Sequence, residues 1–129
     1  MTTYHSTRNA EKTLTASQAI LQGIAPDGGL YVPDHIPALD IALDRLADMT
    51  YQELAYEVMK KFFDDFTEEE LKHCVNAAYD DKFDDSTIVP LVKAGGHHYL
   101  ELFHGPTIAF KDMALSILPH LLTTSAKKN

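Results

Sequence analysis

The sequence predicts a mixed α/β chain (α+β), in which short strands alternate with amphipathic helices. Three segments have the capping-box form, with Thr15, Thr50 and Thr67 each followed three residues later by Gln or Glu. Apolar residues recur at helical spacing behind the second and third boxes. Short apolar runs bounded by glycine and proline mark the strands. The 129 residues are enough for one modest domain with its own core.

The first third of the chain is expected to hold strands, a short helix and a turn. Residues 4–7 predict a first strand, and the box at Thr15 predicts a helix that ends at Gly23. Residues 26–29 (Pro-Asp-Gly-Gly) predict a turn, because glycine accepts the positive φ that other residues resist. Residues 30–32 then predict a strand that the following proline ends.

The middle of the chain predicts a helical hairpin. A weak pattern favours a helix over residues 38–49. The boxes at Thr50 and Thr67 open two stronger helices, which residues 64–66 join and which share one apolar seam. Cys74 is the single cysteine, so no intramolecular disulfide can form, and the pattern places it as a small core residue of the second helix.

The acidic segment, residues 80–86, is expected to be a solvated linker. It divides the chain into an amino-terminal domain, residues 1–85, and the start of a second domain, residues 86–129.

The last helix should kink or begin a new turn at Pro119. Its polar end, residues 123–129, should fray.

A β-hairpin is expected to open the second domain. Residues 88–92 predict an edge strand, since Pro90 has no backbone N–H to donate to a ladder. Gly95 and Gly96 predict the hairpin turn, and residues 99–103 the return strand.

Composition excludes several classes of function. A net charge of -8 and a pI near 5.2 argue against nucleic acid or an anionic membrane as a partner. No apolar run is long enough to span a bilayer, and the first residues lack the layout of a secretory signal, so we expect a cytoplasmic location. The seven histidines show no zinc-type spacing, and the adjacent His97 and His98 should point to opposite faces of a strand. No metal site is predicted.

One lysine has an unusual position. Residues 103–112 form a tight Gly-Pro loop that runs into an apolar helix, with Lys111 at the junction. The positive end of a helix dipole disfavours a cation there, which favours a reactive amine. Position alone leaves open an ordinary lysine that reaches solvent.

The residues around Lys111 resemble those of a known family. The segment His-Gly-Pro-Thr-Ile-Ala-Phe-Lys-Asp (residues 104–112) is similar to the cofactor-lysine segment of threonine synthases, which are pyridoxal-phosphate (PLP) enzymes. Residues 4–9, 19–20 and 23–33 resemble the amino-terminal signature of the same family. The two blocks lie in the order and at roughly the spacing that this family shows, so the resemblance covers essentially the whole chain.

The resemblance implies a fold and an activity. Residues 1–85 would be the family's amino-terminal domain, and residues 86–129 would open a tryptophan-synthase β-like (fold type II) PLP domain. Threonine synthases convert O-phospho-L-homoserine and water into L-threonine and phosphate. Lys111 would form a Schiff base with PLP and shuttle protons, while Phe110 and Thr107 would shape the cofactor pocket. A helix cap is an equally good interpretation of Thr107.

Other polar residues carry two interpretations each. Arg8 could bind a substrate phosphate through its planar fork, or pair with an acid and stabilise the fold, which we favour. Residues 27–29 resemble an anion-binding loop, but a plain turn fits better. Asp112 is interpreted as a first-turn acid favoured by the helix dipole. His104 is expected to shape the Gly-Pro loop.

The family pattern extends beyond these residues. Its glycine-rich loop for the PLP phosphate and its partner for the pyridine nitrogen lie after the lysine segment and are not among the 129 residues. We therefore expect an amino-terminal fragment that is inactive alone, needs the remainder of the PLP domain and could self-associate through its last helix. The alternatives are a lyase acting on a related phospho-hydroxy amino acid and a non-catalytic assembly module.

Overall fold

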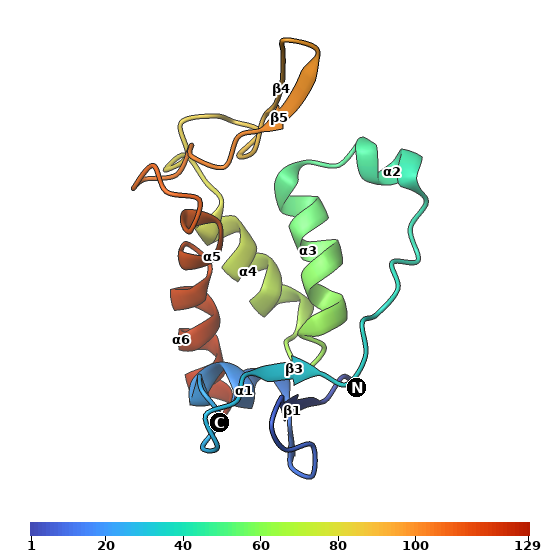
Figure 1. The fold of residues 1–129 in the computed structure, drawn as a ribbon, viewed down its shortest axis with the longest axis vertical. Helices are drawn as coiled ribbons and strands as arrows, with labels where there is room; N and C mark the ends of the chain where they lie inside the picture. The colour runs from blue at the N-terminus through green and yellow to red at the C-terminus, as the bar shows by residue number, and fades with distance from the viewer.

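The computed structural model describes all 129 residues and has the mixed α/β architecture that the sequence predicts. The longer helices run along the length of the molecule, a three-stranded sheet closes one end, and a two-stranded hairpin projects from the other (Figure 1). None of the helices combines the length and the apolar character needed to cross a membrane.

The sheet is antiparallel with the order β2-β1-β3. The central strand β1 (Tyr4–Ser6) and β3 (Tyr31–Pro33) confirm the predicted strands, whereas β2 (Thr13–Leu14) was not predicted. The hydroxyl of Tyr4 donates a hydrogen bond of 2.7 Å to the backbone carbonyl of Phe62, which ties the sheet to the helical hairpin.

All three predicted capping boxes open helices. They precede α1 (Ala16–Gln22), α3 (Tyr51–Phe62) and α4 (Glu68–Ala78), and both reciprocal hydrogen bonds are present in each box. Helix α1 ends at Gly23, where φ is +70°, as the sequence predicts. Helices α3 and α4 pack against each other as the expected hairpin.

The helix predicted over residues 38–49 is mostly wrong. Only α2 (Leu43–Ala47) is helical, and its N-cap residue Ala42 makes no side-chain hydrogen bond. Leu43 is 82% exposed, so little tertiary packing supports the segment. A helix without a cap or a buried face is marginal at this length, which explains why it stays short.

The main core lies around α4. Leu71, Cys74 and Val75 are at most 1% exposed, which confirms that Cys74 is a core residue. The acidic segment is not simply a solvated linker, because Phe83 is only 4% exposed and packs in this core. The core therefore draws on residues from both sides of the predicted division at residue 85. Its buried members are Phe66, Leu71, Cys74, Val75, Ala78, Tyr79, Phe83, Ile88, Ile117 and Leu121.

The hairpin has the predicted turn but shifted strands. Gly95 and Gly96 have φ values of +55° and +81°. The strands are β4 (Leu91–Ala94) and β5 (His97–Leu100), so residues 88–90 and 101–103 of the predicted strands are not β. The ladder begins after the proline, as its missing N–H requires.

The end of the chain forms α5 (Asp112–Leu115) and α6 (Leu118–Lys128). Pro119 lies in the first turn of α6, which confirms that a new turn starts there. The predicted fraying of residues 123–129 is wrong, since α6 remains helical to Lys128.

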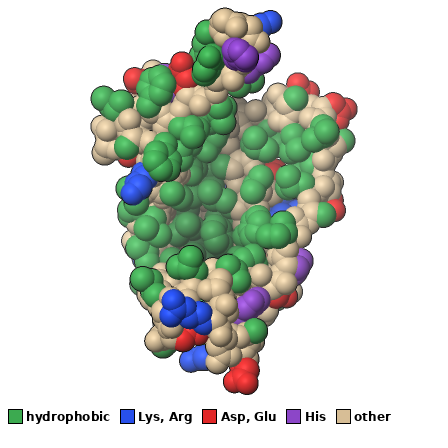
Figure 2. All heavy atoms as spheres, in the orientation of Figure 1, with side chains coloured by type: hydrophobic (Ala, Val, Ile, Leu, Met, Phe, Trp, Pro, Cys, Tyr) green, Lys and Arg blue, Asp and Glu red, His purple; other side chains and the backbone are tan.

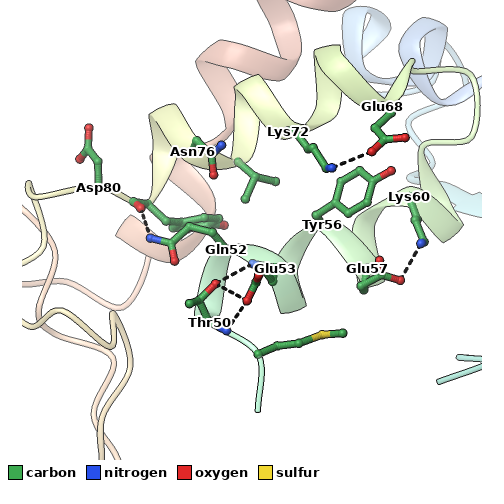
Figure 3. A pocket seen from close by; sticks show the side chains of 13 residues that line it. Thr50, Gln52, Glu53, Tyr56, Glu57, Lys60, Glu68, Lys72, Asn76 and Asp80 are labelled. Carbon is green, nitrogen blue, oxygen red and sulfur yellow. Dashed lines mark hydrogen bonds and ion pairs between the residues drawn. The ribbon is translucent and has the colours of Figure 1, made fainter. Parts of the chain in front are cut away.

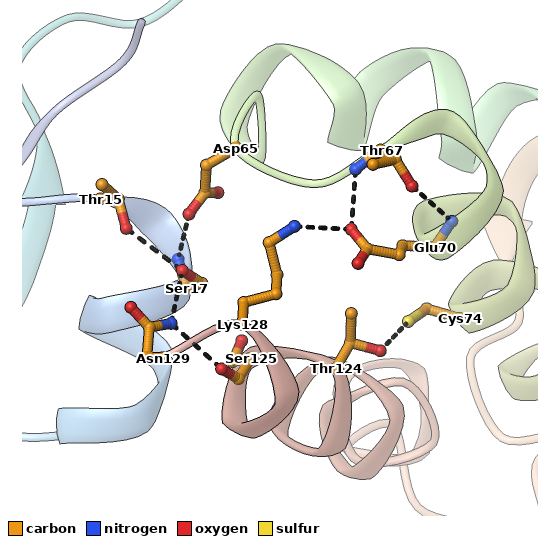
Figure 4. Close-up of polar contacts among 10 residues, drawn as sticks. All are labelled: Thr15, Ser17, Asp65, Thr67, Glu70, Cys74, Thr124, Ser125, Lys128 and Asn129. Atoms are coloured by element: carbon orange, nitrogen blue, oxygen red, sulfur yellow. Dashed lines mark hydrogen bonds and ion pairs between the residues drawn. The ribbon is translucent and has the colours of Figure 1, made fainter.

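Polar contacts with distant elements hold this end in place (Figure 4). Asn129 donates a hydrogen bond of 3.0 Å to the hydroxyl of Ser17 in α1, and the backbone N–H of Ser17 donates to Asp65. Lys128 pairs with Glu70 at 2.7 Å. These partners are remote in sequence, so a local pattern could not reveal them.

Candidate functional site

Lys111 lies where a short loop meets α5. It is the residue preceding the helix, and its side chain is exposed. Its amine takes part in none of the ion pairs or hydrogen bonds of the structure. The predicted neighbours Phe110 and Thr107 lie in the same loop, and Phe110 is 66% exposed. The structure therefore presents a free primary amine, and the residue that precedes it in the chain is an exposed phenylalanine.

Asp112 organises the turn that leads to Lys111. Its carboxylate accepts two hydrogen bonds from Thr107, one from the backbone N–H at 2.8 Å and one from the hydroxyl at 2.7 Å. Ile108 has a φ of +62°, which is strained for a β-branched residue. Asp112 is only 3% exposed, so it is a buried clamp on the turn in addition to an acid in the first turn. Thr107 acts as its donor, not as a helix cap.

The same bonds affect the titration of Asp112. The Thr107 hydroxyl, followed by the Thr107 backbone N–H, lowers the pKa of this carboxyl below its usual value. A lowered pKa in the folded state means that the clamp adds to stability at neutral pH. That contribution disappears as the pH falls through the lowered pKa.

Gly105 allows Asp112 to pack closely. A Cβ added at Gly105 would lie 2.5 Å from the Asp112 Cβ and 2.6 Å from its Oδ2. We expect Gly105→Ala to lower the free energy of unfolding by about 1–3 kcal/mol, because the clamp must move. Urea denaturation measures this effect. The matched control is Ala109→Ser, which adds one atom at an exposed position of the same loop and should change stability by less than about 0.5 kcal/mol. Equal stability of the two variants would contradict the clamp.

Arg8 follows β1 and contacts the loop at residues 27–29, far along the chain from the lysine loop. Its Nη1 donates a hydrogen bond of 2.9 Å to the backbone carbonyl of Asp27. Arg8 thus stabilises the fold through a carbonyl, where pairing with a carboxylate was expected. Its role in substrate binding stays a prediction.

The loop at residues 27–29 is filled by its own acid. The Asp27 carboxylate accepts hydrogen bonds of 2.8 Å from the Ser6 hydroxyl and from the Gly29 backbone N–H. These bonds lower the pKa of Asp27, the Gly29 bond most. A carboxylate in this place occupies the donors that an anion would need, which supports the plain turn.

A groove of about 790 Å³ lies between α3 and α4, a feature that the sequence did not indicate (Figure 3). Its charges are paired within the groove, with Lys72 at 2.6 Å from Glu68 and Lys60 at 2.6 Å from Glu57. The ring of Tyr56 lies between the two lysines, whose Nζ atoms are 5.1–5.2 Å from its centroid. The groove therefore lacks the convergent, unpaired donors that a phosphate site requires.

Apolar side chains gather over one broad face of the molecule (Figure 2). Several large apolar residues of the loop and of the last two helices are exposed. They are Phe103, Ile108, Phe110, Leu115, Leu118 and Leu122. No group of three or more His, Cys, Asp or Glu side chains is placed to hold a metal ion.

Comparisons with known proteins agree on one family. Residues 3–79 match the family model described as threonine synthase N terminus. Threonine synthase of Corynebacterium glutamicum is 43% identical over 126 residues, which cover 92% of this chain and 26% of that protein. The Saccharomyces cerevisiae enzyme is 37% identical over 128 residues, covering 92% of this chain and 25% of its own.

Solved structures give the same result. The PLP-bound threonine synthase of Brucella melitensis superposes with a TM-score of 0.87 and 32% identity over 99% of this chain and 28% of that chain. Yeast threonine synthase superposes with a TM-score of 0.88 and 34% identity over 98% of this chain and 26% of its own. The chain thus spans about a quarter of the length of the relatives that it matches.

Proposed function

Because this chain belongs to the threonine synthase family, we propose that it forms the amino-terminal part of a PLP-dependent lyase that converts O-phospho-L-homoserine and water into L-threonine and phosphate. The observation that carries the proposal is the free amine of Lys111 within the family's lysine segment. The proposal includes a cytoplasmic location and a small-molecule substrate. Self-association through the exposed apolar residues stays a prediction.

The residues around Lys111 suit the cofactor. A primary amine condenses with an aldehyde only when it is accessible and not held in an ion pair, and Lys111 meets both conditions. Both oxygens of the adjacent Asp112 are engaged by Thr107, so this carboxylate does not compete for the amine. Phe110, the preceding residue, is exposed and would offer an apolar side chain to the cofactor. When bound, PLP supplies the electron sink that stabilises a carbanion.

The roles of the residues follow from these positions. Nζ of Lys111 would hold the cofactor and, as an amine, would accept and return a proton. Thr107 and Asp112 would keep the loop in the conformation that presents this amine. The PLP phosphate and ring nitrogen require further binding partners. We propose that these partners lie in the part of the enzyme that corresponds to the remaining length of its relatives, about three quarters of each.

Two measurements test the proposal. The full-length gene product is incubated with PLP, reduced with borohydride and digested, and we expect the cofactor mass on the peptide that contains Lys111. Phosphate and threonine are then followed after adding O-phospho-L-homoserine, with residues 1–129 alone as the comparison. We expect turnover by the full-length protein and background release by the shorter polypeptide. Label on another lysine, or phosphate release without threonine, would count against the assignment.

A further inference from the structure

His104 lies between two carboxylates, just before the turn that leads to Lys111. Its Nδ1 is 2.5 Å from Oδ1 of Asp84, and its Nε2 is 2.8 Å from Oε2 of Glu101. The side chain is only 14% exposed. A neutral imidazole can donate through one nitrogen only, whereas an imidazolium donates through both. The geometry therefore fits a charged His104 that bridges Asp84 and Glu101.

This bridge connects the lysine loop to the main core. The backbone N–H of Asp84 donates a hydrogen bond of 3.0 Å to the carbonyl of His104, in addition to the contact between their side chains. The residue before Asp84 is Phe83, which is buried in the core. Two bonds thus fasten His104 to a segment that cannot move freely.

On its other side, His104 leads directly into the turn that Asp112 clamps. Gly105 follows His104 and packs against the Asp112 side chain, and Asp112 in turn holds Thr107. The turn is therefore fixed at both ends, by His104 where it begins and by Asp112 where the helix starts. The amine of Lys111 projects from the segment between these two fixed points.

We propose that His104 is a positioning residue for Lys111. As an imidazolium, His104 fastens the beginning of the turn (residues 105–111) to the acidic segment and so determines the position of the Lys111 amine. This inference rests on the proposed role of Lys111 as the cofactor lysine. The charged groups that face His104 are Asp84 and Asp85 from the acidic segment and Glu101 from the chain that follows β5.

The cluster has a defined response to pH. The hydrogen bond to Glu101, which has the larger effect, and the hydrogen bond to Asp84 raise the pKa of His104 above its ordinary value. A raised pKa in the folded state means that the bridge is complete below the ordinary histidine pKa and is lost as the pH rises through the raised value. The positioning of Lys111 should weaken over the same interval.

The experiment compares the rate of PLP incorporation at Lys111 in three full-length proteins: wild type, His104→Gln and His98→Gln. His98 is an exposed strand residue and serves as the matched control. Rates are obtained by borohydride trapping and peptide mapping between about pH 6 and pH 9, a range that spans the ordinary histidine pKa. The ratio of wild-type to variant rate cancels the pH dependence of the lysine itself.

For His104→Gln we expect the ratio of wild-type to variant rate to be about ten at the acidic end of the range, because a small displacement of a reacting group slows its reaction by about this factor. The ratio should fall toward one as the pH rises. For His98→Gln the ratio should stay near one throughout. A His104→Gln ratio that does not change with pH would overturn the positioning role. Absence of label from Lys111 in the wild type would instead overturn the proposed function, so the two failures are distinguishable.

A second variant guards against misfolding of His104→Gln. Asp84 is 78% exposed, so Asp84→Asn should leave the fold intact while removing one of the two carboxylates. We expect the ratio of wild-type to Asp84→Asn rates to exceed one near neutral pH, because the bridge in the variant is lost at a lower pH. A rate profile identical to that of the wild type would contradict the proposal.

Discussion

Replacement of Lys111 by alanine in the full-length protein is expected to reduce turnover of O-phospho-L-homoserine by about a thousandfold or more, because under the proposed function the variant loses both the cofactor attachment and a proton-transfer group. The side chain is exposed and makes no hydrogen bond or ion pair, so the fold should be unchanged by circular dichroism. Borohydride treatment should no longer fix PLP to the peptide that contains residue 111.

Two controls separate this result from a general effect of losing a lysine. Lys93→Ala changes an exposed lysine in β4, away from the loop, and should keep the wild-type rate. An added primary amine should restore part of the activity of Lys111→Ala, since it can transfer the proton that the missing side chain carried. Full turnover by Lys111→Ala would remove the basis of the proposed function.

The largest effect on stability is expected from Leu71→Ala. Leu71 is 1% exposed and belongs to the main core, so its truncation leaves a cavity and should cost about 2–5 kcal/mol. Typical domains are stable by only about 5–15 kcal/mol, so this loss is a large fraction of the total. Urea denaturation followed by circular dichroism should show a lower midpoint with a similar slope.

The control for this variant is Leu43→Ala. Leu43 is 82% exposed in α2, and the same truncation there should change stability by less than about 0.5 kcal/mol. A comparable loss at both positions would show that burial around α4 does not dominate the stability of this chain.

The elements predicted correctly are those whose determinants are local. The helices behind Thr15, Thr50 and Thr67 begin where their capping boxes are, because a box forms entirely within four residues. The turn at residues 95–96 follows from its two glycines in the same way. The two-residue strand β2 is too short to leave a periodic pattern.

The errors arise where distant contacts decide. The polar end of α6 reads as a fraying terminus, but Asn129 and Lys128 find partners in α1 and at the start of α4. The acidic segment reads as a linker, yet its one aromatic residue, Phe83, is buried in the core. Sequence periodicity carries no record of such pairings.

The site was predictable in part. The lysine segment predicts a cofactor role for Lys111 through its resemblance to a family, and that role stays a prediction. The clamp of Asp112 on Thr107 was not anticipated, because it depends on a turn with a positive φ at Ile108, a conformation that this residue type does not suggest. His104 was expected to shape the loop, but its partners, Asp84 and Glu101, became clear only from the fold.

The core around α4 includes Ile117 and Leu121, which follow Lys111 in the chain. On the ribosome, this core can close only after those residues have left the exit tunnel. We therefore expect the amino-terminal region to remain unprotected against proteases during synthesis until the loop that carries Lys111 and the helix after it have emerged, so that this loop and the core fold in a single cotranslational step.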